Sequence, residues 1–584
     1  MTIMKKILLT ICFFATVNMS AQLLFTSKTD GAWDGGTSVW TITDPTMSGK
    51  TNTTPQSTDD VTIAATHEID INDGTNAVCN NLITTNNNTC MLDINAGASL
   101  TVSGNVTVGR FDNSIRLFHS VTKNAVFIVN GTITDKRIYQ RRTLNKKKWF
   151  LISSPFLNAK KSKFLTTSTN TVTNSAANGF LSGDGTKTSF ASYNDGNASG
   201  SKYVYTLEAS KTTGNLTDAA GYSIYLDKAS GTPAYAMQGK YHHGATTSVT
   251  ISDAGNGYNL VGNAYLAYVY ANNAANATHN VLLDNTGILD QETIWLWDGD
   301  SATWITKNQS DGTGYHISPG QGFFVKAKTG GGNFTFDKDL QTIDSSDDVF
   351  LKSSNNNRFE VDLNVTIGKQ KRSASIRYID NMTTDFDNGY DSSTFGGYAS
   401  SFEVYTNLVG KDSGKKLAIQ SLPNVNFEDM IIPVGVTADA NSEITFSAKA
   451  LNVPTGYKVF LEDRLNSTFT RLDEVDAEYT ATVTEKTTEG RFYLHARTSA
   501  LSLDSELLNS VRIYKSNTST LKIVGLSQGK TNVSLYNVIG EQVLKASFNA
   551  NGTKEISLPR LSSGVYVVQL ETETGKVNKK IVLE

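Results

Sequence analysis

The chain has little cysteine, proline and charge for its length. Its 584 residues include 3 cysteines, 9 prolines and 7 histidines, and only 18% are Asp, Glu, Lys or Arg. So few cysteines exclude a disulfide-dense scaffold and a cysteine-rich zinc fold. The formal net charge is −3 and no Lys- or Arg-rich stripe stands out. We therefore expect no nucleic-acid partner.

Long amphipathic helix patterns and recognised catalytic motifs are also missing. The sequence contains no H-E-x-x-H, C-x-x-C, P-loop or dinucleotide-binding fingerprint. Gly525 to Gly529 fits G-x-S-x-G, but it joins two short strand patterns, whereas a nucleophile elbow joins a strand to a helix. We expect Ser527 to be a turn residue. No catalytic residue is predicted, and the chain is not expected to be an enzyme.

The one long apolar run is at the N-terminus. Lys5 and Lys6 precede an apolar stretch of about a dozen residues, and a small-residue site follows. The run is shorter than the ~20 residues that span a bilayer. The pattern predicts a signal peptide over residues 1–21, cleaved between Ala21 and Gln22.

Cleavage leaves two cysteines, Cys79 and Cys90, eleven residues apart in sequence. In an exported chain, two neighbouring cysteines favour a disulfide. Two free buried thiols on neighbouring strands are the alternative.

What the chain does have is short runs of alternating apolar and polar residues, separated by Gly, Asn and Asp turns. This period of two predicts an all-β, multidomain protein. From residue 22 to 148 the runs resemble one another, as in Leu92 to Val108, where each unit has one small apolar face. Such units need stacked neighbours to bury that face. We expect a short β-solenoid, with a β-sandwich as the alternative.

The rest of the chain divides into segments that differ in composition and strand pattern. The predicted parts are a β-rich module at 149–345, a β-sandwich at 346–497, a polar linker at 498–510 and a small immunoglobulin-like sandwich at 511–584.

The last segment carries specific motifs. They are Asn537-Val-Ile-Gly540, Leu561-x-x-Gly564-Val-Tyr566-Val-Val, and Lys579-Lys-Ile-Val-Leu583. These motifs resemble the type A C-terminal sorting domain of type IX secretion cargo, a family of Bacteroidota. The resemblance implies export through an outer-membrane translocon to the cell surface or medium. It also implies a shuttle barrel that docks the domain and a sortase that removes it.

The sorting signal is assigned to eight residues: Gly540, Gly564, Tyr566, Lys579, Lys580, Ile581, Val582 and Leu583. We expect the two glycines at turns with positive φ. Strand alternation places Ile581 and Leu583 on one face and Val582 on the other.

The middle of the chain also has a resemblance. Trp149-Phe-Leu-Ile-Ser-Ser-Pro and Pro319-Gly-Gln-Gly-Phe-Phe-Val resemble a β-rich module of large exported proteins from the same bacteria. Nearby, the basic cluster from Arg141 to Lys148 is interpreted as a solvated strand edge, which would discourage edge-to-edge pairing.

Two further patterns are candidate ligand sites. Asp385, Asp387 and Asp391 share one acidic loop, and carboxylate oxygens close in sequence suit a weak Ca²⁺ site. An acidic solvated turn is the alternative. Trp295 and Trp297 alternate on one strand face, which suits stacking on a sugar ring. However, Ile294 and Leu296 make the other face apolar too, which favours an internal strand and core packing.

These observations give three functional hypotheses. The first is an exported, non-enzymatic, adhesin-like surface or secreted protein. The second is a protein that binds or degrades polysaccharide, and the third has a structural role in gliding motility or matrix. The residues do not identify the glycan or other surface ligand.

Overall fold

The computed structural model describes residues 22–45, 47, 49–85, 89–109, 112–134, 137–145, 148–161, 164, 168–169, 172–173, 186–210, 213–226, 233–242, 244, 246–344, 358–398, 400–410, 414–498, 512–517, 520–572 and 575–583. Strands dominate, and α2 (Val281–Asp284) is a single short helical turn. The all-β prediction is confirmed. Among these residues no helix combines the length and apolarity needed to cross a membrane. The predicted signal peptide, with Ala21, lies outside the described residues.

The chain forms two compact units. The first comprises residues up to 356 together with Asn388–Tyr398, and the second comprises Asn357–Asp387 and the residues from Ala399 on.

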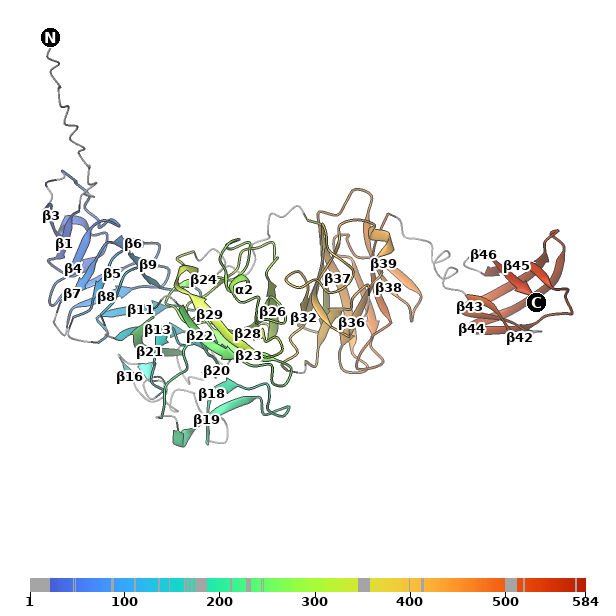
Figure 1. Ribbon diagram of the computed structural model, residues 1–584, viewed down its shortest axis with the longest axis horizontal. Helices are drawn as coiled ribbons and strands as arrows, with labels where there is room; N and C mark the ends of the chain where they lie inside the picture. Colours follow the sequence, from blue (N-terminus) through green and yellow to red (C-terminus); the bar gives the residue numbers. More distant parts are fainter. Residues whose placement is uncertain are drawn as a thin grey trace, which may run out of the picture. The chain divides into compact units, whose positions relative to one another are not determined.

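A short parallel β-solenoid, spanning about residues 61–142, begins the first unit and confirms the repeat prediction (Figure 1). Its strands form three faces. The first face contains β1 (Leu24–Ser27), β4 (Asp60–Ile63), β7 (Leu82–Thr84) and β10 (Val106–Thr107), with β3 (Trp40–Thr43) antiparallel at one edge. The second contains β2 (Gly31–Ala32), β5 (Glu68–Ile71), β8 (Met91–Ile94), β11 (Ile115–His119) and β13 (Arg137–Thr143). The third contains β6 (Asn76–Cys79), β9 (Ser99–Val102) and β12 (Val126–Val129).

Equivalent residues of successive rungs stack in columns. Ile69 pairs with Leu92, Leu92 pairs with Ile115, and all three are fully buried, so one rung takes about 23 residues. At a corner, the Asn81 amide N donates to Asp60 Oδ1 at 3.1 Å, and the Asn105 amide N donates to Asn81 Oδ1 at 2.8 Å. These side chains satisfy backbone donors that the turn leaves unpaired.

The solenoid continues directly into the β-rich module. β21 (Ala234–Tyr241) pairs antiparallel with β13 along seven residues, and β15 (Phe156–Leu157) follows β21. One module sheet has the order β14-β20-β18-β19: β14 (Trp149–Ser153), β20 (Gly221–Tyr225), β18 (Lys187–Tyr193) and β19 (Tyr203–Leu207). Another has the order β23-β28-β25-β26: β23 (Tyr258–Gly262), β28 (Gly322–Lys326), β25 (Thr293–Asp298) and β26 (Thr303–Asn308).

Smaller sheets complete the module. β22 (Thr246–Ile251) pairs with β29 (Gly332–Asp337), and β24 (Tyr268–Tyr270) lies between β27 (His316–Ile317) and β30 (Gln341–Thr342). The α2 turn begins at Asn280, whose side chain caps Leu283 N at 2.9 Å.

The second unit contains a large sheet in the order β39-β38-β41-β36-β34-β35-β32-β31-β37-β40. Its strands are β31 (Glu360–Ile367), β32 (Gln370–Ile379), β34 (Glu403–Thr406), β35 (Leu417–Pro423), β36 (Ile432–Thr437), β37 (Glu443–Leu451), β38 (Lys458–Asp463), β39 (Thr468–Arg471), β40 (Glu478–Thr482) and β41 (Phe492–Arg497). The sheet curls until its two ends meet at Tyr479 of β40. The Tyr479 hydroxyl contacts Thr468 Oγ1 at 3.2 Å and donates to Asp463 at 2.8 Å.

The sorting segment forms an antiparallel sheet with its own apolar core. Its strands are β42 (Arg512–Asn517), β43 (Thr520–Asn537), β44 (Gln542–Ser557), β45 (Gly564–Thr572) and β46 (Gly575–Leu583). The expectation for Ser527 is wrong, because β43 is one continuous strand with register irregularities near Leu526 and Gly529.

The sorting residues behave differently from one another. Gly540 lies at the β43–β44 turn with φ +84° and Gly564 begins β45 with φ +159°, so both have the expected positive φ, although Gly564 is nearly extended. Tyr566 is buried and donates its hydroxyl to Ser562 O at 2.8 Å. Ile581 is buried and Val582 is exposed, as alternation predicts. Lys579 and Lys580 are exposed, and the side chain of Leu583 lies outside the described residues.

The predicted disulfide is wrong. Cys79 ends β6 on the third solenoid face, whereas Cys90 precedes β8 of the second, and both are free and buried. The Cys90 thiol donates to Ile63 O at 3.2 Å instead. Burial raises the pKa of the Cys90 thiol. The stacking of the rungs determines where Cys79 and Cys90 lie. Their short separation in sequence therefore does not bring the two thiols together.

Candidate functional site

A cavity of about 410 Å³ lies where the solenoid joins the module in the first unit. Three segments line it: the end of β13 with the following turn and β14, the β25–β26 hairpin, and the loop that leads into β28. Tyr235 of β21 and Val121 add to the lining. We name this the seam cavity.

A row of three side chains crosses the strands at one side of the seam cavity. Arg142 of β13 is in register with His119 of β11 and with Tyr235 of β21. Residues in register on neighbouring strands share a face of the sheet. The Arg142 Nη2 group donates to Pro319 O at 2.9 Å and lies 3.3 Å from His119 Nδ1. The sheet register therefore places one cation between an imidazole and a phenol.

His119 does not share the positive charge. Its side chain is buried, and its Nδ1 accepts a hydrogen bond from Ala125 N at 3.2 Å. Burial, together with the Arg142 charge, holds the pKa of His119 well below its usual value, so the imidazole is neutral. Burial likewise raises the pKa of Tyr235, although Arg142 partly offsets this, and the phenol keeps its proton.

The β25–β26 hairpin forms a second wall of the cavity. Trp297 and Trp304 are cross-strand partners, with ring centroids 5.1 Å apart in an edge-to-face arrangement. At the turn, Asp298 accepts from Asp300 N at 2.8 Å and from the Ser301 hydroxyl. Asp300 forms an ion pair with Lys148, which ties the hairpin to the segment before β14.

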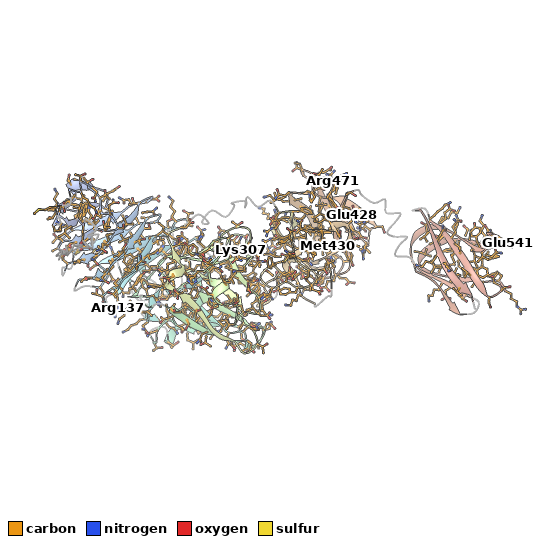
Figure 2. All side chains as sticks on the ribbon, turned by 45° about the horizontal axis from the view of Figure 1, so that its top comes forward. Arg137, Lys307, Glu428, Met430, Arg471 and Glu541 are labelled. Atoms are coloured by element: carbon orange, nitrogen blue, oxygen red, sulfur yellow. The ribbon has the colours of Figure 1, made fainter. Side chains whose placement is uncertain are left out.

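The loop before β28 forms the third side. Gly320 adopts φ +65°, a conformation that favours glycine. Its carbonyl oxygen accepts from Ser153 N at 2.8 Å, and Ser318 N donates to the Gln321 side chain at 2.9 Å. Lys307, labelled in Figure 2, pairs with Asp311 at 3.5 Å. This loop carries the Pro319-Gly-Gln-Gly motif.

The interpretation of the basic cluster as a strand edge is wrong. β13 lies inside its sheet, between β11 and β21, so it offers no free edge. The sequence contained a usable signal, because adjacent Arg141 and Arg142 must point to opposite faces of a strand. In a strand with one buried face, one of the two therefore faces inward.

Trp295 lies in the core, whereas Trp297 lines the seam cavity. Trp295 is fully buried, as the core-packing interpretation predicted, and its indole N–H donates to Ser393 O at 3.0 Å. β25 is internal to its sheet, also as predicted. Trp297 lines the seam cavity and is half-buried. Alternation placed the two residues on one face, but it could not show which one meets the cavity.

The three acidic residues of the predicted Ca²⁺ site do not form a metal-binding group. Asp385 and Asp387 belong to the second compact unit, whereas Asp391 belongs to the first and is fully buried. Asp387 accepts from Thr383 N at 2.7 Å and so stabilises its own turn. Within the described part of the chain, no group of three or more His, Cys, Asp or Glu side chains could hold a metal ion.

Comparisons with known proteins match nearly the whole chain to two family models. Residues 32–495 match a family described as a domain of unknown function (DUF8693), and residues 515–584 match the secretion system C-terminal sorting domain. The second match confirms the predicted sorting domain, so the type IX secretion machinery handles this protein and exports it across the outer membrane to the cell surface or medium. No curated protein matches.

Two solved structures are distantly similar. A polysaccharide lyase shares 9% identity over 38% of this chain and 39% of its own, with a TM-score of 0.12. The BSP domain of a biofilm-associated protein shares 9% identity over 68% of this chain and 88% of its own, with a TM-score of 0.13. The chain thus spans about two fifths of the lyase's length. At these TM-scores neither structure indicates the fold or the function of this chain.

Proposed function

We propose that the chain, which belongs to the family described as a domain of unknown function (DUF8693), is an exported, adhesin-like protein that binds a ligand without transforming it. Its sorting domain delivers the protein to the cell surface or medium. The seam cavity is the ligand site of the exported part.

The lining of the seam cavity is the observation that supports this proposal. Aromatic, backbone and charged groups surround a space of about 410 Å³, within the range of small-molecule sites. No histidine, cysteine or glutamate is among the lining residues. Its one serine, Ser318, therefore has no lining histidine to act as a general base. The chemistry of the lining favours recognition over catalysis.

Binding and turnover can be separated in one experiment with the full exported chain. The protein is immobilised and probed with a glycan array and with labelled cells, and the glycans that bind are then assayed for released reducing ends. We expect retention of ligand without release of new ends. Time-dependent release that needs the folded protein would overturn the non-enzymatic proposal.

A polysaccharide-cleaving activity is the second candidate. Asp298 and Asp300 place two carboxylates at one rim of the cavity, and glycosidases use such pairs. Against this, Asp298 stabilises its own turn and Asp300 is paired with Lys148. If cleavage occurs there, Asp298→Asn abolishes the release of reducing ends while the protein stays folded.

For delivery, we propose that a shuttle barrel docks the sorting sheet and a sortase then removes it. β46 occupies one edge of this sheet and pairs antiparallel with β45. The pairing begins with Gly564 opposite Leu583 and ends with Thr572 opposite Gly575. Deleting residues 580–584 removes buried Ile581 and the edge-strand pairing around it. We expect the truncated protein to accumulate in the periplasm, measured by fractionation and immunoblotting.

The matched control is Lys576→Gln, which alters an exposed lysine of the same strand and leaves the strand pairing intact. Normal export of the truncated protein would contradict the proposed role of this strand.

A further inference from the structure

Arg142 is a cation at the seam cavity without a matching carboxylate. Its guanidinium hydrogen bonds go to the carbonyl oxygen of Pro319 and to neutral His119. No carboxylate of the described residues lies within ion-pair distance of its guanidinium. A partly buried charge without a counter-charge is costly, and a bound anion would remove that cost.

The two lysines around the cavity differ from Arg142, because each has a carboxylate partner. Lys307 pairs with Asp311 at 3.5 Å, and Lys148 pairs with Asp300. Arg142 is thus the position where the lining still needs a negative charge. The planar guanidinium is also the side chain best suited to a carboxylate, since it can donate two parallel hydrogen bonds.

The remaining lining fits a polyhydroxylated ring. The half-buried Trp297 and Tyr315 offer aromatic surface of the kind that packs on sugars. Asp298, on the hairpin wall, supplies carboxylate oxygens that can accept from hydroxyl groups. Two donors among the lining residues, the Tyr235 hydroxyl and the Trp297 indole N–H, have no hydrogen-bond partner in the described structure. Buried donors without partners are uncommon, and a polar ligand could satisfy them after a small side-chain movement.

We propose that the seam cavity binds the uronic-acid end of an acidic glycan. The sugar carboxylate accepts hydrogen bonds from the Arg142 guanidinium, the ring packs against the aromatic wall, and ring hydroxyls donate to Asp298. The cavity volume of about 410 Å³ suits about one or two sugar rings. This inference rests on the proposed function, because it assigns a ligand class to the same cavity.

The test measures binding of galacturonate and glucuronate to the full exported chain by calorimetry and ligand-observed NMR. Galactose, glucose and the methyl ester of galacturonic acid serve as neutral counterparts. Acetate serves as a carboxylate without a sugar ring. We expect both uronates to bind at least about tenfold more tightly than their neutral counterparts and than acetate, and to weaken as salt is added. Equal binding of galacturonate and its methyl ester would overturn the proposal without any variant.

Arg142→Gln keeps a hydrogen-bonding side chain but removes the charge, and we expect it to weaken uronate binding at least about tenfold. Arg142→Lys should retain part of the affinity. The matched control is Arg137→Gln on the same strand, because Arg137 pairs with Asp112 and does not line the cavity. Unchanged binding by folded Arg142→Gln, or equal losses in the two glutamine variants, would overturn the proposal.

The outcomes also distinguish this proposal from the proposed function. If neutral glycans are retained and uronates are not, the protein still binds a ligand but the acidic class is wrong. If acetate binds as tightly as the uronates, Arg142 holds a simple anion and the glycan assignment is wrong.

Discussion

Two arginines, one in each compact unit, have opposite surroundings. Arg491 of the second unit donates to both carboxylate oxygens of Asp463, from Nε at 2.9 Å and from Nη2 at 2.7 Å. The Asp463 side chain is fully buried and the Arg491 side chain is 10% exposed. Arg142 of the first unit contacts a carbonyl oxygen and a neutral imidazole instead.

The two arginines differ in whether the fold itself balances their charge. At Arg491 the charges cancel within the fold, and Tyr479 and Asn466 complete the hydrogen bonding of Asp463. That arrangement needs nothing from outside the protein. At Arg142 no carboxylate of the described residues balances the charge, and in the proposed complex the ligand carboxylate does so. Measurements of stability on the two arginines should therefore differ in size.

Arg491→Gln should have the largest effect on stability. It leaves the buried Asp463 carboxylate without its cation, and breaking such a pair costs about 3 kcal/mol. Calorimetry or denaturant unfolding of the full chain should show a loss of this size in the transition of the second unit. Lys576→Gln, which breaks the exposed pair between Lys576 and Glu571 of the same unit, is the control and should cost less than about 1 kcal/mol. Equal losses would mean that burial of the pair does not matter.

The pH dependence of the same pair gives a second contrast. Burial alone would raise the pKa of Asp463, but hydrogen bonds from Arg491 and Tyr479 outweigh it and hold that pKa below its usual value. A carboxyl group with a lowered pKa stabilises the fold above its unfolded pKa of about 3.9, and this stability is lost as pH falls through the folded pKa. The gap in stability between wild type and Arg491→Gln should therefore shrink below about pH 4. A gap that stays constant to pH 2 would show that Asp463 does not titrate in this way.

Tyr479→Phe should have a smaller effect, about 1 kcal/mol, because it removes one hydrogen bond to a charged partner and leaves the Arg491 pair in place. The lost hydroxyl also joins the two ends of the large sheet through Thr468. Hydrogen exchange should then increase first in β39 and β40. Uniform exchange across the unit would contradict this local role.

Arg142→Gln should change stability least, by less than about 1 kcal/mol. It loses two hydrogen bonds but removes a charge that no described carboxylate balances, and these effects oppose each other. The pKa of His119 should rise in this variant, because a nearby positive charge is gone. NMR titration of the imidazole would check this, and a loss as large as that of Arg491→Gln would remove the contrast between the two sites.

Much of the fold could be predicted from the sequence because its signals are local. Alternation identified strands such as β5, β8 and β9, and the resemblance between units indicated stacked rungs. The sorting domain was identified from motifs such as Asn537 to Gly540. All of these depend on residues that are neighbours in sequence or repeat at a fixed spacing.

The site could not be predicted because it depends on pairings over long separations. Arg142 meets Tyr235 only because β13 and β21 pair across almost a hundred residues, and no local pattern specifies that register. The disulfide prediction was wrong for the opposite reason. Cys79 and Cys90 are close in sequence, but the stacking of the rungs places them on different faces of the solenoid. The acidic loop fails for a similar reason, because Asp387 and Asp391 belong to different compact units.

The stacking of the solenoid also affects how the protein can change length during evolution. Each rung offers the next one the same parallel edges, so a whole rung of about 23 residues could be inserted between β5 and β8 without altering β11, β13 or β21. Such an insertion would lengthen the stack by about 4.8 Å. An insertion that shifted a strand by one residue would instead turn its buried side chains outward. The length of the solenoid can therefore vary by whole rungs while the seam cavity stays the same.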